Sequence, residues 1–468
     1  MLFLGVGPAL AEDWPAWRGP DGTGVSADAA FPLKWSDTQN ECWRVALPDR
    51  GNSTPIVWGN RVFITQAIEK EQRRTLMCFA RDSGRLLWQS GVTYQQREPT
   101  NAQNPYCSAS PVTDGKRVIA YFGSAGLFCY DFDGRELWHR DLGKVDSWQG
   151  SGSSPVIYRD LCILNAGPGT HAALIACNAS NGEVVWKVTP PKDSGRGVDP
   201  VKPAADPPKQ SPSTGPVDKP GDPPKPKASD DAPDTAGGKS GFDNAMMSAD
   251  PSGAGGFLGS WSTPVVLRVA GRDELIVVHA FRVIGYDPSS GKELWWCGGL
   301  PEQAFASPAI GDGWLVATGH VLIGGGTRIT AVKLGDAAGD ITATHRLWQI
   351  DLRKECVGSP VIAGGNVYLM THFGSAVCLD GATGNKRWEK RLSGQAGPSG
   401  SWSSLVLADG KLLAPNHAGE VFILKASPDF ELLATNLAAE EPTCASLAIS
   451  DGQVFLRTYK SLWCFGKK

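Results

Sequence analysis

Three histidines of this chain occupy equivalent positions in an internal repeat, which makes them the first candidates for metal chemistry. His279, His372 and His417 share one register position, and His171 and His320 lie close to the same side of the expected structure. A shared metal needs imidazole nitrogens within about 2.1 Å of it, whereas packed sheets lie about 10 Å apart. Only adjacent repeat units could cooperate, and polar residues at turn positions are the simpler interpretation. We therefore predict no metal site.

Amide and aromatic side chains stand just before several repeat units begin, where they are expected to surround a central channel. This candidate binding set consists of Asn52, Trp148, Trp261, Phe305 and Trp402. An indole is a large ring with a single polar N–H group, so two interpretations stay open for Trp261 and Trp402. They pack against neighbouring loops, or they form an apolar platform for a sugar ring or for a partner's strand. We assign binding to this set and name no catalytic residue.

Sequence motifs of the common catalytic sites do not stand out in the chain. No nucleophile elbow, phosphate-binding loop or His-x-x-x-His spacing rises above background, and no Cys-x-x-Cys-His sequence is present for haem attachment. Several of the eleven cysteines recur inside apolar runs, as Cys78, Cys129, Cys177, Cys378 and Cys464 do. We expect buried small hydrophobic side chains rather than a disulfide framework.

The elements that must position these residues belong to an internal repeat of four short strands. Each unit begins with Ser/Thr-Pro-Val or a variant of it, continues through apolar runs, and ends with an Asp/Asn-x-x-Gly turn and a Trp. Such runs between Gly and Asn turns predict strands and hairpins. Eight units start at Thr54, Ser110, Ser154, Thr263, Ser307, Ser359, Ser404 and Ser446. The closing Trp recurs at Trp88, Trp138, Trp186, Trp295, Trp348 and Trp388, where its ring can fill the wedge between sheets.

The ends of the chain predict how the ring closes. The eighth unit stops at Phe465 after its third strand, whereas residues 41–46 form a Trp-containing strand before the first unit. The N-terminal strand is expected to complete the last blade and to hide the edge strands. Strand parity places the inter-blade connections on one face and only short, repetitive turns on the other. The sequence thus predicts an all-β, eight-bladed β-propeller of four-stranded antiparallel blades, closed by the N-terminal strand.

Composition divides the chain into four stretches. Residues 1–11 are a short apolar run ending in Ala-Leu-Ala, which is typical of a signal peptide although a basic region is missing. Residues 12–189 are assigned to the closing strand and blades 1–3, and residues 257–468 to blades 4–8. Residues 190–256 are rich in Pro, Lys, Asp, Gly and Ser. They lack the apolar content that offsets ordering entropy, so we predict a disordered insert whose removal leaves the fold intact.

Charge and hydropathy narrow the classes of partner. The formal net charge is −3 over 468 residues, and no stripe of lysine or arginine stands out. This pattern argues against a nucleic-acid partner. The apolar start is too short to span a bilayer, so we expect no transmembrane segment. We expect an exported protein of the periplasm or cell envelope.

The unit starts and ends resemble PQQ-like propeller repeats. The resemblance rests on residues 287–295 and 380–384, with residues 259–264 and 344–348 similar to BamB-like (outer-membrane assembly factor B) envelope propellers of planctomycete-type bacteria. Two groups share such repeats, namely the PQQ-dependent alcohol dehydrogenases and BamB with related non-catalytic envelope proteins. The repeat is specific for the fold and weak for the function.

The dehydrogenase resemblance implies an axial quinone, a calcium ion bound by carboxylate and amide oxygens, an aspartate base, a Trp floor and a disulfide between adjacent cysteines. No Cys-Cys pair occurs here. Calcium takes six to eight oxygen ligands, yet the positions expected to line the channel offer few carboxylates. They offer Asn52, Ser108, Ser151, Ser260 and Ser401. PQQ with calcium is therefore disfavoured, and we expect no cofactor.

The leading functional hypothesis is a non-catalytic scaffold that presents its loop-rich face to an envelope protein partner. A PQQ-dependent dehydrogenase of alcohols or sugars is the main alternative. A propeller that binds carbohydrate at its aromatic mouth is a third possibility. Convergence of carboxylates on the axis would separate the first two hypotheses.

Overall fold

The structure is a computed structural model of the 468-residue chain, and it describes residues 13–28, 30–190, 259–321 and 325–466. The chain divides into one unit of residues 1–196 with 257–468 and a second unit of residues 197–256, and every described residue belongs to the first. The predicted leader, 1–11, and all of the predicted insert except Pro190 lie outside the described residues.

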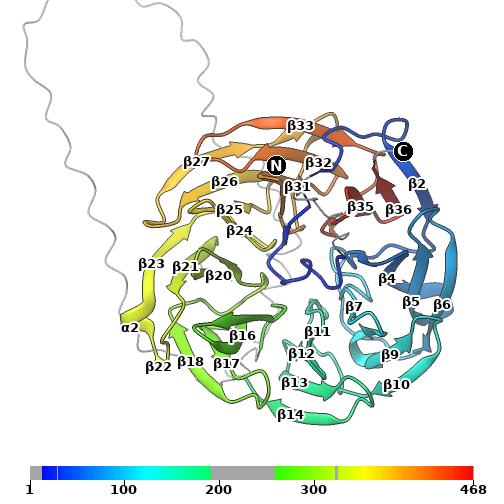
Figure 1. Cartoon of the computed structure of the whole chain (residues 1–468), viewed down its shortest axis with the longest axis horizontal. Coiled ribbons are helices and arrows are strands. Elements are labelled where there is room, and N and C mark those ends of the chain that lie inside the picture. The colour runs from blue at the N-terminus through cyan, green and yellow to red at the C-terminus, as the bar shows by residue number, and fades with distance from the viewer. Residues whose placement is uncertain (1–12, 29, 191–258, 322–324, 467–468) are drawn as a thin grey trace, which may run out of the picture. The chain divides into compact units, whose positions relative to one another are not determined.

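Eight of the nine sheets formed by the described strands have four consecutive antiparallel strands and are arranged as blades around one axis (Figure 1). Blade 1 contains β3 (Ile56–Trp58), β4 (Arg61–Ile68), β5 (Arg73–Ala80) and β6 (Leu86–Thr93), and blade 2 contains β7 (Val112–Thr113), β8 (Arg117–Tyr121), β9 (Leu127–Asp131) and β10 (Glu136–Arg140). Blade 3 contains β11 (Val156–Tyr158), β12 (Leu161–Ala166), β13 (Ala173–Asn178) and β14 (Val184–Val188). Blade 4 contains β15 (Val265–Val269), β16 (Arg272–Val278), β17 (Arg282–Tyr286) and β18 (Glu293–Gly298).

Blades 5 to 8 follow the same plan. Blade 5 contains β19 (Ala309–Gly311), β20 (Trp314–His320), β21 (Thr327–Lys333) and β23 (Arg346–Leu352), and blade 6 contains β24 (Val361–Ala363), β25 (Asn366–Met370), β26 (Ser375–Asp380) and β27 (Lys386–Arg391). Blade 7 contains β30 (Val406–Ala408), β31 (Lys411–Pro415), β32 (Glu420–Lys425) and β33 (Leu432–Leu437). Blade 8 contains β34 (Ala448–Ser450), β35 (Gln453–Arg457), β36 (Ser461–Phe465) and β2 (Glu41–Ala46). The smaller elements are β1 (Val25–Ser26), β22 (Gly339–Asp340), β28 (Ser393–Gly394), β29 (Gly397–Pro398), the 3-10 turns η1 (Glu69–Glu71) and η2 (Gly123–Ala125), and α2 (Thr342–His345).

The N-terminal strand closes the last blade. β2 pairs antiparallel with β36, so that Trp43 lies opposite Cys464 and Ala46 opposite Ser461. This pairing supplies the outer strand that the eighth unit lacks and leaves no blade short of a strand within the described part of the chain. The predicted eight-bladed ring and its closure are confirmed.

A ring of hydrogen bonds joins the eight predicted blade starts. At each step, the backbone N–H of one start donates to the side-chain hydroxyl of the next start, over 2.9 to 3.1 Å. The order is Thr54, Ser110, Ser154, Thr263, Ser307, Ser359, Ser404, Ser446 and back to Thr54. The repeated Ser or Thr therefore satisfies a buried backbone donor of the preceding blade, which explains why each unit begins with a hydroxyl.

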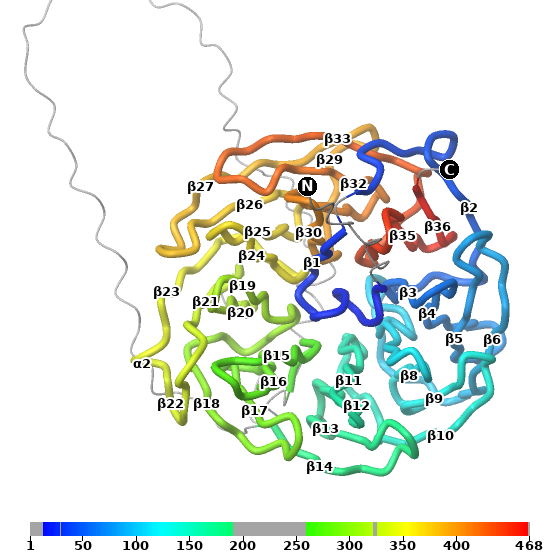
Figure 2. The backbone as a smooth tube through the Cα atoms, in the orientation of Figure 1, coloured from blue at the N-terminus to red at the C-terminus, as the bar shows by residue number. Residues whose placement is uncertain are grey.

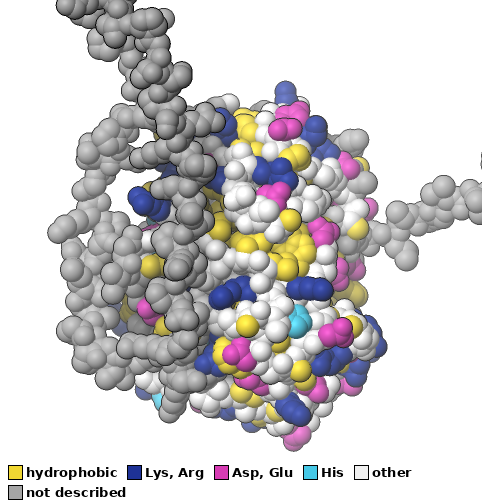
Figure 3. All heavy atoms as spheres, turned by 90° about the vertical axis from the view of Figure 1, so that its left-hand side faces the viewer, with side chains coloured by type: hydrophobic (Ala, Val, Ile, Leu, Met, Phe, Trp, Pro, Cys, Tyr) yellow, Lys and Arg dark blue, Asp and Glu magenta, His cyan; other side chains and the backbone are white. Residues whose placement is uncertain are grey.

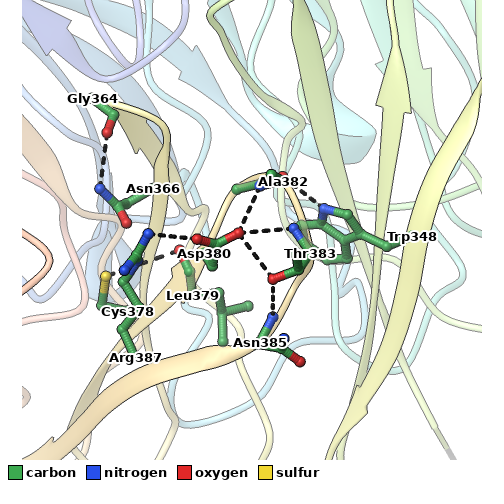
Figure 4. Close-up of polar contacts among 11 residues, drawn as sticks. Trp348, Gly364, Asn366, Cys378, Leu379, Asp380, Ala382, Thr383, Asn385 and Arg387 are labelled. Atoms are coloured by element: carbon green, nitrogen blue, oxygen red, sulfur yellow. Dashed lines mark hydrogen bonds and ion pairs between the residues drawn. The ribbon is translucent and has the colours of Figure 1, made fainter. Parts of the chain in front are cut away.

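Outer-strand tryptophans fasten most blades to the next, as Figure 4 shows for blades 5 and 6. Trp348 Nε1 donates to the carbonyl oxygen of Gly381 at 2.7 Å, in the turn between β26 and β27. The Asp380 carboxylate shapes this turn by accepting hydrogen bonds from the N–H groups of Ala382 and Thr383. Equivalent indole-to-carbonyl bonds join Trp43 to Arg81, Trp88 to Phe132, Trp138 to Ala179 and Trp186 to Pro288. The predicted wedge role of the tryptophans is confirmed.

Trp295 makes a different contact because blade 5 has a different turn. Residues 334–345 form β22 and α2 in place of an Asp-x-x-x-Gly turn, and β22 pairs in parallel with β18. The fully buried Trp295 indole instead donates to the Glu274 carboxylate of its own blade at 2.7 Å. Arg272 pairs with that carboxylate at 2.6 Å and donates to the Ala337 carbonyl at 3.0 Å. An ion pair between the buried Glu274 carboxylate and the partly exposed Arg272 thus accompanies the indole contact that replaces the usual turn contact.

The cysteines behave as small apolar side chains. All eleven are free thiols, and each is buried except Cys42, which is half-buried. Burial holds the pKa of Cys162 well above its usual range, so its sulfur stays protonated. The predicted burial of Cys78, Cys129, Cys177, Cys378 and Cys464 is confirmed.

One side of the ring carries charges of both signs. Figure 3 views the side where β23 and β27 lie, and basic and acidic side chains are interspersed there with hydrophobic ones. Among the described residues, no helix has the length and apolarity needed to cross a membrane.

Candidate functional site

Residues 13–28 form a plug that closes one end of the channel, and Figure 2 shows this segment crossing the centre of the ring. Trp14 pairs with Val57 at the end of β3, and Thr113 N–H donates to the Pro15 carbonyl. β1 pairs in parallel with β30. These contacts all lie where the innermost strands end, on the face predicted to carry only short turns. That prediction was wrong at the centre of the face, because the N-terminal plug covers it.

Arg18 anchors the plug to the ring. Its guanidinium is buried and donates to backbone carbonyl oxygens of Ser359, Pro360 and Leu405 in blades 6 and 7, and to that of Thr23 within the plug. Burial lowers the pKa of Arg18 to about 9. Four carbonyl dipoles around one cation offset part of its desolvation cost, so the side chain can stay under the channel.

An axial pocket occupies the other end of the channel, on the mouth face, which we define as the face carrying the inter-blade connections and the turns between second and third strands. Its volume is about 130 Å³. Trp17 of the plug forms part of its lining, and hydroxyl groups of the blade starts line it further. These starts are Thr54, Ser110, Ser154, Ser359, Ser404 and Ser446. None of the described residues that line this pocket carries a charge at neutral pH.

The axial pocket brings together four of the five predicted binding residues. Asn52, Trp261, Phe305 and Trp402 all line it, whereas Trp148 is half-buried outside the lining. Ser108 also lines the pocket. The other serines expected there are absent from its described lining: Ser151, Ser260 and Ser401. Ser260 and Ser401 are buried and donate to carbonyl oxygens of Val278 and Pro415.

Two lining amides, Asn104 and Gln149, were not assigned by sequence reasoning. Gln149 follows Trp148 directly, so the aromatic residue marked the right connection and its neighbour reaches the pocket. Asn104 lies in the long connection between blades 1 and 2, where its Nδ2 donates to the carbonyl oxygens of Gln149 at 2.6 Å and Ser151 at 2.9 Å. These bonds hold that connection over the entrance to the third blade.

The aromatic side chains combine packing with access to the pocket. Trp261 stacks on Phe305 with ring centroids 4.7 Å apart and planes inclined by 26°. The Trp261 Nε1 group donates to the Gly150 carbonyl at 2.9 Å, which fixes the ring against a neighbouring connection. Trp402 meets the His372 ring edge-on at 5.7 Å. Trp261 therefore packs against a loop, as the first interpretation held, and it also lines the axial pocket.

A family model described as outer membrane protein assembly factor BamB matches residues 72–206 and 279–466, well over half of the chain. The chain belongs to this family. No curated protein sequence matches the chain significantly.

Several solved structures are similar to the chain at low sequence identity. BamB from Moraxella catarrhalis is 13% identical and superposes with a TM-score of 0.54 over 91% of this chain and 99% of that chain. The computationally designed Ika8 protein is 11% identical, with a TM-score of 0.54 over 92% and 100% of the two chains. A quinohemoprotein alcohol dehydrogenase from Comamonas testosteroni is 12% identical, with a TM-score of 0.45 over 97% and 81%. At these identities, the likeness to the first two structures shows the fold alone.

One wall of the axial pocket in this BamB-family propeller carries a cysteine next to a histidine. Cys444 Sγ lies 3.3 Å from His417 Nδ1 and 3.4 Å from the Tyr459 hydroxyl. Burial raises the pKa of the Cys444 thiol to about 11, although the hydrogen bond with Tyr459 acts in the other direction. Nucleophilic cysteines need a lowered pKa. The sulfur therefore stays protonated, and this arrangement is not an activated nucleophile.

The three histidines in equivalent positions lie in the turns between second and third strands of blades 4, 6 and 7, as their common register predicted. His279 is buried and its Nε2 lies 3.3 Å from the Tyr286 hydroxyl, whereas His372 and His417 contact Trp402 and Cys444. Across the described ranges, no group of three or more His, Cys, Asp and Glu side chains could hold a metal. Each histidine instead packs within its own part of the mouth face.

We expect His279 to make the folded state sensitive to acid. Burial lowers its pKa from the usual 6.5 to about 4, so the unfolded state takes up a proton first as the pH falls. The neutral side chain therefore stabilises the fold fully above pH 6.5, and this contribution disappears as the pH falls to about 4. This pKa shift corresponds to a contribution of about 3 kcal/mol to the free energy of unfolding.

Thermal unfolding between pH 7 and pH 4 checks this expectation. His279→Gln should flatten part of the loss of melting temperature in acid. His139→Gln is the control, because the His139 side chain is 63% exposed. A pH profile that is identical in wild type and His279→Gln would contradict the assignment.

Proposed function

We propose that this BamB-family propeller is a non-catalytic scaffold of the cell envelope that holds a protein partner on its mouth face. Membership of a family named for assembly of outer-membrane proteins supports a role in assembly. The observation that carries the proposal is the uncharged lining of the axial pocket. The small net charge of −3 gives no support for a nucleic-acid partner.

The axial pocket does not fit PQQ with calcium. Its described lining offers carboxamides and hydroxyls, of which Asn52 and Ser110 are examples, but no carboxylate for a calcium ion or for a general base. Among the described lining residues there is also no lysine or arginine to pair with the carboxylates of the quinone. We therefore place the PQQ-dependent dehydrogenase second to the scaffold.

The mouth face also offers an apolar anchor for a partner. Phe373 lies in the turn between β25 and β26 and is 53% exposed. Its ring lies 5.1 Å from His372, which in turn contacts Trp402. Binding energy at interfaces concentrates in a few aromatic or arginine anchors, so the exposed Phe373 ring is the strongest candidate for a partner contact.

Phe373→Ser should therefore weaken capture of the envelope partner by at least about tenfold, or about 1.4 kcal/mol. Val185→Ser is the matched control, since Val185 is 52% exposed but lies on the outer strand β14. The measurement is affinity capture from the native envelope, quantified for the proteins that the wild type retains. Equal capture by the two variants, with both folded, would remove the mouth face from the proposal.

A further inference from the structure

The axial pocket has hydrogen-bonding groups that the described residues do not satisfy. Gln149 is 3% exposed and lines the pocket, yet its Nε2 has no hydrogen-bond partner among the described residues. Asn52 donates through Nδ2 to the Gln103 carbonyl at 2.6 Å, but its buried Oδ1 has no hydrogen-bond partner among the described residues. A buried polar group left unpaired costs about 1–3 kcal/mol. An occupant that supplies both an acceptor and a donor would recover this free energy.

Aromatic rings lie across the same pocket. The stacked pair of Trp261 and Phe305 forms part of its lining, and Trp402 reaches it from the connection between blades 6 and 7. The hydrogen bond from Trp261 Nε1 to Gly150 holds that indole in place without any ligand. A preformed aromatic wall suits a ligand with one apolar face, because C–H groups pack well on ring faces.

Size and charge exclude several other ligand classes. Trp17 of the plug lines the pocket, and the plug pairs with Val57 and with β30 of the innermost strands, so a polymer chain could not thread through the ring. The volume of about 130 Å³ is small for a ligand pocket and limits the site to one small ring. An anionic or cationic ligand would lose its hydration without gaining a charged partner from the lining.

We propose that the axial pocket binds a single neutral pyranose ring, with hydroxyls on the Gln149 and Asn52 amides and its C–H face on the aromatic wall. A sugar combines the apolar face and the hydroxyl rim that these walls require. The inference goes beyond the scaffold proposed above, because it concerns the axis of the ring and not the exposed rim at Phe373.

Binding of methyl glucoside and N-acetylglucosamine, measured by calorimetry and ligand-observed NMR on the full chain, tests this site. Glucuronate and glucose 6-phosphate are the charged controls. We expect saturable binding of at least one neutral sugar and at least tenfold weaker binding of both anions. Absence of binding by either neutral probe, or equal binding of neutral and anionic rings, would overturn the proposal.

Variants locate the binding inside the molecule. Gln149→Met should weaken the neutral sugar about tenfold, or about 1.4 kcal/mol. Gln303→Met is the matched control, because Gln303 is also 3% exposed but does not line the pocket. Trp402→Leu provides a second variant at a half-buried position if Gln149→Met fails to fold. Unchanged affinity in a folded Gln149→Met or Trp402→Leu protein would contradict the site.

Two results separate this inference from the proposed scaffold. Phe373→Ser should lose the protein partner and keep the sugar, whereas Gln149→Met should lose the sugar and keep the partner. Loss of both activities in either folded variant would show that one site serves both, which contradicts the separate axial site.

Discussion

Replacing Trp43 by alanine should destabilise the propeller by about 3–5 kcal/mol, since this residue fastens the strand that closes the ring. The Trp43 side chain is buried, and its Nε1 donates to the Arg81 carbonyl of blade 1 at 2.6 Å. Its ring also packs against Phe455 of the last blade, with the ring centroids 6.1 Å apart. The substitution would remove indole contacts to both blades that meet at the closure. Chemical denaturation measures the loss.

Trp88→Ala is the informative control for ring closure. Trp88 makes the same kind of bond, to the Phe132 carbonyl at 2.8 Å, between two blades that are continuous in the chain. We expect hydrogen exchange of the β36 amides to accelerate in Trp43→Ala and to stay unchanged in Trp88→Ala. Equal protection of β36 in the two variants would show that the closing strand does not depend on Trp43.

Gly384→Ala should be the second strongly destabilising change. Gly384 has a φ of 75°, and a Cβ atom there would lie 2.7 Å from Trp348 Cε3. A left-handed conformation costs an alanine about 1–2 kcal/mol, and overpacking against the indole adds about 1–3 kcal/mol. The measured quantity is the free energy of unfolding in denaturant.

Gly364→Ala isolates the effect of the indole contact. Gly364 lies in the same blade at a φ of 54°, and a Cβ atom there would meet nothing within 4 Å. It should therefore show the backbone cost alone. If Gly364→Ala and Gly384→Ala lose the same stability, the Trp348 contact does not limit the residue at position 384.

The blade architecture could be predicted because the repeated residues themselves make the contacts between blades. The Ser or Thr at each blade start, such as Ser110 and Ser154, supplies the hydroxyl that accepts a hydrogen bond from the start of the preceding blade. The closing Trp and the Asp-x-x-x-Gly turn supply the outer fastening, as Trp348 and Asp380 do. A contact that recurs in every unit leaves a periodic signal in the sequence. Trp295 departs from it where the turn of the next blade departs as well.

The plug could not be predicted because its contacts are not periodic. Arg18 donates to the Ser359 carbonyl, which lies 341 residues further along the chain. Nothing in residues 13–28 shares the repeat pattern that revealed the blades.

The lining of the axial pocket was predictable in type but not in every residue. Asn52, Trp261, Phe305 and Trp402 were found by their place before a blade start. Trp148 was assigned from the sequence, whereas its neighbour Gln149 lines the pocket. The connection is irregular, so no repeat pattern shows which of two adjacent side chains reaches the pocket.

The most direct test of a binding scaffold against a quinone enzyme is thermal unfolding of the wild type with PQQ and calcium, combined with a dye-reduction assay. A ligand that binds only the folded state, at a hundred times its dissociation constant, stabilises the fold by about 2.7 kcal/mol. The uncharged lining of the axial pocket predicts an unchanged melting temperature and no quinone-dependent dye reduction. A clear rise in melting temperature accompanied by dye reduction would contradict the scaffold and establish the protein as a dehydrogenase.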